Sequence, residues 1–198
     1  AASALVVALV RQAVEKVGGT LTAVNIGTTA ASEQAAASTV LAMKPAAVML
    51  IGINVQGFGN GLRKLSAAGI KVVSISLPQD VSQFGITFNV QGAPTYALAG
   101  RLMADWAIGK KGAKANVTFY GIPEIAFTAT MQQAFVGEMR KNCPGCHVRT
   151  ESVPIASMGT TAPRTIVTDL QAHPGTNVAV FTNGQLASGL PAAFKSAG

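Results

Sequence analysis

The sequence is poor in charged residues, in aromatic residues and in cysteine, and each shortage excludes a class of protein. Only 12% of the 198 residues are charged and 6% are aromatic, whereas 49% are hydrophobic. This balance excludes a disordered chain, which has few apolar residues and much charge. The two cysteines are too few for a disulfide-rich scaffold. No apolar run is long enough to cross a bilayer, so we expect no direct membrane insertion of this chain.

Acidic residues are also scarce, with 8 against 15 basic residues and a formal net charge of +7. The basic residues are spread along the chain, and their densest group is Lys110, Lys111 and Lys114. A protein that reads nucleic acid concentrates such residues on one element and adds aromatic side chains that stack on bases. We therefore predict a solvated turn at this group and no nucleic-acid partner.

Apolar runs that suit buried strands alternate with segments of helical periodicity. Such alternation predicts an α/β protein with parallel sheets covered on both faces, and right-handed crossovers make these sheets doubly wound. The predicted strands are 21–26, 46–51, 70–75, 84–90, 115–120, 147–153 and 177–181. The predicted helices are 1–17, 32–43, 57–68 (with its leading loop), 94–108, 126–142, 162–173 and 184–197.

A polar turn with Gly92 and Pro94 follows the strand predicted at 84–90. We interpret this turn as the crossing between two α/β lobes, residues 1–91 and 92–198. Ligands of such sheets bind beyond the carboxyl ends of the strands, so the loops there are the candidate binding loops.

Cys143, Cys146 and His147 form a C-x-x-C-H motif between a predicted helix and a predicted strand. We predict a local disulfide between Cys143 and Cys146, which would pin this turn in an exported protein. A redox-active dithiol, a c-type haem attachment and half of a zinc site are the alternatives for this spacing. His173 is the only other histidine, and two cysteines cannot complete a structural zinc site. We therefore expect no cofactor and no metal.

No pattern nominates a catalytic residue. The sequence has no paired carboxylates at useful spacing and no G-x-S-x-G motif. The loop over residues 52–61 is rich in glycine, but its glycines do not have the spacing of a dinucleotide fingerprint or a complete P-loop. We predict that the protein is not an enzyme and that this loop, with Asn54, is the wall of a binding cleft. Trp106 and Met103 are expected in the core.

The order of these segments resembles the type I periplasmic solute-binding proteins, the sugar-binding-like group that serves ABC importers. The apolar strand 46–51, the segment 62–75 that ends in Gly69-Ile70-Lys71-Val72-Val73-Ser74-Ile75, and the segment 181–198 carry the resemblance. It covers essentially the whole chain. The resemblance implies two lobes that close around a ligand by a hinge near residues 89–94. The family begins one strand earlier and continues past Gly198, so the resemblance also implies that both ends are truncated.

The candidate ligand-binding residues follow from the family's pocket positions. The resemblance implies hydrogen-bonding roles for Asn54, Ser76, Asn183 and Gln185, apolar walls from Phe127 and Met131, and a partner for an anion or a carbonyl group in Arg164. Three positions depart from the sugar-binding pattern. Ser76 and Gly184 stand where the family has acids, and Met131 stands where it has an arginine. We therefore expect a ligand with a sizeable apolar part and one acidic or carbonyl group, not a free hexose.

The resemblance implies an extracytoplasmic solute-binding protein that captures a small molecule in an interlobe cleft and delivers it to the permease of an ABC transporter. Its location would be periplasmic or extracellular, with membrane anchoring by a missing N-terminal segment as one form. The alternatives are the effector-binding core of a lactose-repressor-type transcription regulator and a Rossmann-like enzyme.

Overall fold

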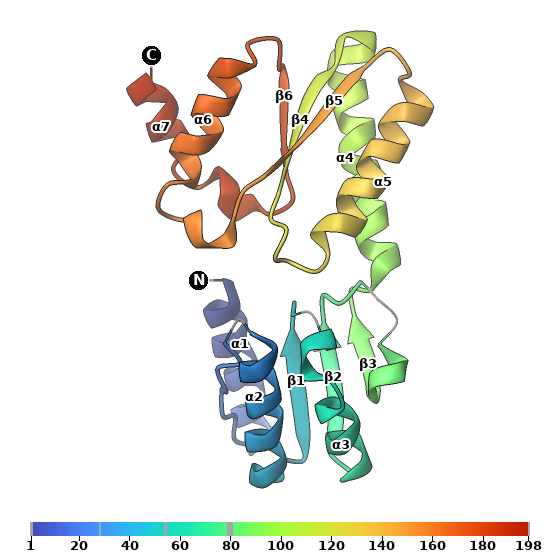
Figure 1. The fold of residues 1–198 in the computed structure, drawn as a ribbon, viewed down its shortest axis with the longest axis vertical. Coiled ribbons are helices and arrows are strands. Elements are labelled where there is room, and N and C mark those ends of the chain that lie inside the picture. The colour runs from blue at the N-terminus through green and yellow to red at the C-terminus, as the bar shows by residue number, and fades with distance from the viewer. Residues whose placement is uncertain (1, 28, 54, 79–80, 198) are drawn as a thin grey trace. The chain divides into compact units, whose positions relative to one another are not determined.

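The computed structural model describes residues 2–27, 29–53, 55–78 and 81–197, which fold as two compact units (Figure 1). Unit 1 comprises Ala1–Ile75 and Asp80–Val90, and unit 2 comprises Ser76–Gln79 and Gln91–Gly198. The assignment of two lobes to residues 1–91 and 92–198 stays a prediction. The two units differ from these lobes, because residues 76–79 belong to unit 2. Among the described residues, no helix has the length and apolar character needed to span a bilayer.

Unit 1 contains a parallel three-stranded sheet in the order β1-β2-β3. The strands are β1 (Ala47–Ile51), β2 (Lys71–Ile75) and β3 (Ile86–Val90), and the helices are α1 (Ala2–Lys16), α2 (Ala30–Met43) and α3 (Gly61–Ala67). Helix α2 begins at a capping box, in which Thr29 Oγ1 accepts a hydrogen bond from Ser32 N at 3.2 Å. Leu62 and Leu65 of α3 are buried, as is Val72 of β2, so one apolar side of α3 belongs to the core of this unit.

Unit 2 contains a second parallel sheet in the order β5-β4-β6, with helices on both faces (Figure 1). The strands are β4 (Asn116–Gly121), β5 (His147–Ser152) and β6 (Val178–Phe181). The helices are α4 (Ala93–Lys111), α5 (Thr128–Asn142), α6 (Ala162–Ala172) and α7 (Leu190–Ala197).

The central strand β4 supplies side chains to both cores of unit 2. Successive residues of a strand point to opposite faces. Val117 and Phe119 join the cluster formed with α4 and α5, whereas Tyr120 joins the cluster formed with α6 and α7. Residues Val117 to Gly121 are all buried, as expected of a strand covered on both sides.

A polar network lies where α6 covers the sheet. Arg149 Nη1 and Nη2 donate to the two carboxylate oxygens of Asp169 at 3.0 and 2.5 Å, and the Tyr120 hydroxyl donates to the same carboxylate at 2.6 Å. Arg149 also pairs with Glu151. Burial by itself raises the pKa of Asp169, but the hydrogen bonds from Arg149 and Tyr120 outweigh it and hold that pKa below its ordinary value. Burial and the adjoining carboxylate raise the pKa of Tyr120 well above its ordinary value.

Three expectations about the elements are wrong. The segment 21–26 forms no strand, because no described strand lies beside it and a strand needs a partner for its hydrogen bonds. The last predicted helix is interrupted: a 3-10 helix, Gly184–Ala187, is separated from α7 by Gly189, whose φ is +84°. Trp106 is not in the core, since 58% of its surface is exposed.

Helices α4 and α5 approach so closely at Gly100 that no side chain fits between them. A Cβ atom at position 100 would lie 2.3 Å from the Met131 carbonyl oxygen and 3.0 Å from the Phe135 nitrogen. Both contacts are with backbone atoms, which cannot rotate away. Glycine at this position therefore sets the distance between the two helices.

We expect Gly100→Ala to destabilise the protein by about 2 kcal/mol or more, because the added methyl group must push α5 outward. The matched control is Gly137→Ala on α5, where an added Cβ meets nothing within 4 Å. The control should stabilise the helix by up to about 1 kcal/mol, since alanine is the better helix former. Urea unfolding followed by circular dichroism measures both. Equal stability of the two variants would contradict this account of the α4–α5 contact.

We expect Asp169→Asn to cost about 1–3 kcal/mol at neutral pH, because it removes one of the two carboxylates that pair with Arg149 and leaves only Glu151. A carboxyl group with a lowered folded-state pKa contributes stability that is present above its unfolded pKa, about 3.9, and is lost as the pH falls through the folded value. The difference between wild type and variant should therefore shrink as the pH falls below about 4. Urea melts at several pH values check this, with the exposed Glu15→Gln as control. A difference that does not change with pH would contradict it.

Candidate functional site

Ser76 and Gln91 directly follow strands β2 and β3, and both have a strained backbone. Their φ angles are 68° and 63°, in the left-handed region that favours glycine. Such a conformation costs about 1–3 kcal/mol in a residue with a side chain and occurs most often at functional sites. The sequence identified Ser76 as a candidate ligand-binding residue but missed Gln91. A polar residue immediately after a predicted strand is the signal that could have found it.

A chain of contacts within unit 2 links Ser76 to Phe127. The Ser76 hydroxyl donates to Gln91 Oε1 at 3.1 Å, and the Tyr96 hydroxyl donates to the same oxygen at 3.3 Å. The Tyr96 ring stacks on the Phe127 ring, with centroids 4.4 Å apart and an angle of 3° between the planes. Burial raises the pKa of Tyr96, and the nearby Ser76 hydroxyl partly offsets this rise. We call Ser76, Gln91, Tyr96 and Phe127 the aromatic-amide cluster.

The aromatic-amide cluster combines an apolar surface with hydrogen-bonding groups. Tyr96 is buried in the core and supports the half-buried Phe127 by stacking, so Phe127 is the ring that can meet an apolar group, while an amide and two hydroxyls can donate or accept. The sequence predicted Ser76 and Phe127 for separate roles, and the structure brings them together through Gln91 and Tyr96. Tyr96 was missed because its place early in a helix carries no functional signal.

Thr128 supplies an unpaired hydroxyl next to this cluster in the sequence. It is the first residue of α5 and is 5% exposed, and its Oγ1 has no hydrogen-bond partner among the described residues. Gly121, at the carboxyl end of β4, makes room for it: a Cβ there would lie 2.8 Å from Thr128 Cγ2. Buried hydroxyls are nearly always paired, so an unpaired one is an unusual feature of this edge of the sheet.

The loops after β5 and β6 hold the other predicted residues of unit 2. Asn183 Oδ1 accepts a hydrogen bond from Gln185 N at 2.8 Å and so caps the 3-10 helix that follows β6. Its amide nitrogen remains for another partner. Arg164 is exposed in the first turn of α6, which follows β5. Arg164 makes no ion pair with any residue that the structure describes.

The structure does not show a ligand-binding role for Met131 or Asn54, two of the predicted residues. Met131 is 7% exposed and packs in the core between α4 and α5, where its carbonyl oxygen faces Gly100. The structure thus gives Met131 a packing role, and its role as a ligand wall stays a prediction. Asn54 lies outside the described residues, so its role also stays a prediction.

Unit 1 holds one polar group that the sequence did not nominate for binding. Glu33, in the first turn of α2, places its carboxylate where a Cβ of Gly57 would be, 1.6 Å from that position. Burial raises the pKa of Glu33. Its carboxylate has no ion-pair partner within the described part of the chain. Gly57 belongs to the glycine-rich loop predicted as a cleft wall, so a half-buried acid of α2 lies against this loop.

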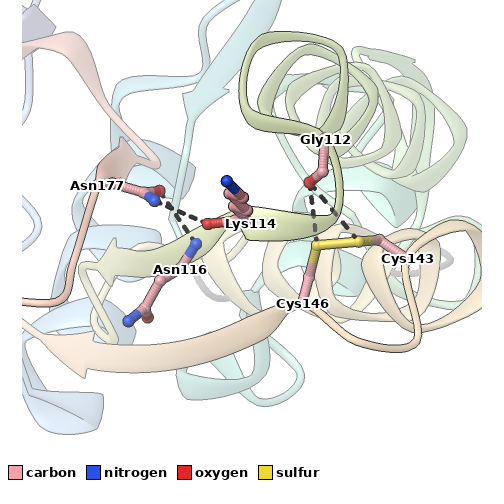
Figure 2. The surroundings of a disulfide bond; sticks show 6 residues. All are labelled: Gly112, Lys114, Asn116, Cys143, Cys146 and Asn177. Carbon is pink, nitrogen blue, oxygen red and sulfur yellow. Dashed lines mark hydrogen bonds between the residues drawn. A yellow bond between two sulfur atoms is a disulfide. The ribbon is translucent and has the colours of Figure 1, made fainter.

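Cys143 and Cys146 form the predicted disulfide, with their Cα atoms 5.4 Å apart (Figure 2). Both sulfur atoms lie against the Gly112 carbonyl oxygen, that of Cys146 at 3.4 Å. Disulfide sulfurs carry no proton, so these are close contacts rather than strong hydrogen bonds. The pair follows the C-terminus of α5, where the helix dipole disfavours a thiolate. This setting favours the structural disulfide over a redox-active dithiol.

Two hollows of unit 2 lie at the opposite edge of its sheet. One of 490 Å³ contains His147 and His173, and one of 410 Å³ lies beside the disulfide. The amino ends of β4 and β5 line the first, and its Arg149 is already paired with Asp169. Ligands of parallel α/β sheets bind at the carboxyl ends of the strands. We therefore place the candidate site at the aromatic-amide cluster.

No protein-family model and no curated protein matches the sequence. Solved structures match the fold. A 5-methylthioribose transporter solute-binding protein from Thermotoga lettingae, in complex with 5-methylthioribose, has a TM-score of 0.80 and 15% identity over 94% of this chain and 58% of its own. An ABC transporter solute-binding protein from Agrobacterium vitis with bound allitol has a TM-score of 0.73 and 18% identity over 93% and 63%. A protein described as a LacI transcriptional regulator from Bacteroides fragilis has a TM-score of 0.68 and 15% identity over 85% and 59%.

These structural similarities show which fold the chain has. The chain has the type I periplasmic-binding-protein fold, and the structures that match it are mainly sugar-binding proteins of ABC transporters. The resemblance inferred from the sequence is thereby confirmed at the level of fold. The chain spans about three fifths of the length of the three solved structures described above, 58% to 63% of each.

The strain at Ser76 yields a prediction about stability. We expect Ser76→Ala to cost about 1 kcal/mol, because it keeps the left-handed φ and loses the hydrogen bond to Gln91. Ser76→Gly should be close to wild type, since relief of about 1 kcal/mol of strain offsets the lost bond. The control is Ser188, which is exposed and has a φ of −64°. There the order should reverse, with glycine less stable than alanine. Urea unfolding measures all four variants, and the same order at both positions would contradict the prediction.

Proposed function

We propose that this chain is the ligand-capturing part of an extracytoplasmic solute-binding protein that delivers a small molecule to the permease of an ABC transporter. The observation that carries the proposal is the aromatic-amide cluster, in which polar groups and two stacked rings converge through Gln91 and Tyr96. The fold supports it, because proteins of this fold include sugar-binding components of ABC transporters. The closure of two lobes stays a prediction within the proposal.

The ligand that suits the aromatic-amide cluster has an apolar part and at least one hydrogen-bonding group. The half-buried Phe127 ring, supported by the buried Tyr96, suits an apolar or planar face, and Gln91 and Ser76 suit a hydroxyl or carbonyl group. Arg164 remains the candidate partner for an acidic group. 5-Methylthioribose, the ligand of one solved relative in fold, joins an apolar thioether to a sugar ring. A free hexose lacks such an apolar part, and Ser76 and Gly184 provide no carboxylate for its hydroxyls.

A binding screen tests the proposal. The protein is titrated by calorimetry with free hexoses, 5-methylthioribose, allitol and alkyl glycosides that carry a carboxylate. We expect binding to be tightest for a compound with an apolar group. Phe127→Ala should weaken it about fivefold or more, because the loss of a stacked ring costs about 1 kcal/mol or more. Phe194→Ala, which removes an exposed ring on α7, is the matched control and should bind like wild type.

Two results would contradict the proposal. Tight binding of a free hexose would overturn the expected ligand class while leaving solute capture intact. Binding that is weakened equally by Phe127→Ala and Phe194→Ala would place the site elsewhere.

The effector-binding core of a transcription regulator is the second candidate, because a LacI-type regulator shares the fold. The compartment separates the two functions, since stable disulfides form in oxidising compartments and are rare in the cytosol. Thiol titration of the denatured protein, isolated from its native source with and without reductant, distinguishes them. An oxidised Cys143–Cys146 pair supports export, and two free thiols favour the regulator.

A further inference from the structure

Helix α4 carries apolar residues on two opposite faces. One face, with Tyr96, Gly100, Ala104 and Ala107, is buried. The other presents Leu98, Leu102 and Trp106, which are 49%, 58% and 58% exposed. These three residues are spaced four apart, so they form one continuous row along the helix. We call this row the α4 stripe.

A row of large apolar side chains on the solvent side of a helix requires an explanation. A helix that is hydrophobic all round is normally covered all round, and contiguous exposed apolar patches mark interaction sites. The stripe includes the only tryptophan of the chain. Tryptophan is among the residues most enriched where protein partners bind. The stripe is not needed for the core of unit 2, which uses the other face of α4.

Two opposite charges, Arg101 and Asp105, lie along one flank of the α4 stripe. Both are exposed, and neither forms an ion pair with any residue that the structure describes. Their order is the less favourable one for a pair within a helix, where the acid is better placed four residues before the base. Their charges therefore remain for an external partner with the complementary pattern.

We propose that the α4 stripe is the contact surface of a homodimer, in which a second copy of α4 packs antiparallel about a twofold axis at Leu102. Such a surface must be complementary to itself. Positions equally far from Leu102 face each other, so Leu98 meets the partner's Trp106, and Thr95 meets the partner's Gly109. The large Trp106 ring thus faces the smaller Leu98 side chain, and the small residues Thr95 and Gly109 meet at the two ends of the contact.

The charges select the antiparallel arrangement. An axis perpendicular to the helices keeps the charged flanks of the two copies on the same side. Arg101 then lies near the partner's Asp105, which is two residues from exact register, and symmetry makes this pair twice. An axis parallel to the helices would place the two charged flanks on opposite sides and form neither pair. The contact rests on one row of three apolar side chains from each copy, so we expect a weak dimer that depends on concentration. The proposal does not depend on the proposed ligand.

Sedimentation velocity over about 1 to 300 µM, the range of weak association, tests the proposal. We expect the mass to rise from one chain towards two, and the Trp106 fluorescence to shift to shorter wavelength together with it. Leu102→Glu should keep the protein monomeric at every concentration, and circular dichroism checks its fold. The matched control, Phe194→Glu on α7, should dimerise like wild type. A wild-type monomer at every concentration overturns the proposal, as does a dimer that Leu102→Glu leaves intact.

A charge exchange tests the antiparallel geometry. Arg101→Glu places two acids side by side and should weaken dimerisation about fivefold to tenfold, since a like-charge contact replaces an ion pair. Adding Asp105→Arg restores opposite charges with their positions exchanged, so the double variant should dimerise within about threefold of wild type. Raising the salt concentration should reduce the difference. A double variant weaker than the single variant, or a single variant equal to wild type, overturns the antiparallel contact.

Discussion

Strand β4 has no side that faces solvent, and this constraint organises unit 2. Phe119 must be covered by α4 and α5, and Tyr120 by α6 and α7. The two helix layers that cover β4 contact it with different kinds of side chain. The α4–α5 side is apolar and packs closely at Gly100, whereas the α6 side surrounds the paired charges of Arg149 and Asp169. Because both layers are tied to one strand, the loop after β4 has a defined position, and Phe127 and Thr128 lie at its end.

The candidate site differs from the core in its backbone. Ser76 and Gln91 keep left-handed φ angles at which glycine would cost less, and their side chains share a hydrogen bond. The unpaired Thr128 hydroxyl is a second departure from the usual rules of packing. Proteins retain such unfavourable features where a binding group needs a particular position. Ser76 and Gln91 follow the carboxyl ends of β2 and β3, and Thr128 begins the helix that follows β4, so each feature lies beyond the carboxyl end of a strand of its own sheet. Ligands of parallel α/β sheets bind beyond such strand ends.

Much of the fold could be predicted from the sequence because α/β alternation is a local signal. The strand at 115–120 and the helix at 126–142 each carry their own periodicity, and the structure places β4 and α5 within two residues of them. The disulfide was also predictable, since a spacing of three residues brings Cys143 and Cys146 together in almost any turn. The segment 21–26 has the composition of a strand, but pairing requires a neighbour, and composition does not show whether a neighbour is present.

The candidate site was predictable only in part. Ser76 and Phe127 could be nominated from the pocket positions of the family that the sequence resembles, whereas Gln91 and Tyr96 could not. Their contribution depends on a carbonyl oxygen shared by two hydroxyls and on two stacked rings, which join residues far apart in the chain. Trp106 shows the same limit, because helical periodicity does not reveal that one apolar face of α4 is left exposed.

The sequence by itself determined the alternation of strands and helices, the parallel sheets that follow from it and the cysteine pair, because each depends on residues that are near neighbours in the chain. The tertiary structure decided which face of α4 is buried, which polar groups meet at Gln91 and which hydroxyl remains unpaired. Those properties depend on distances between segments, and such distances are set by packing rather than by local preference.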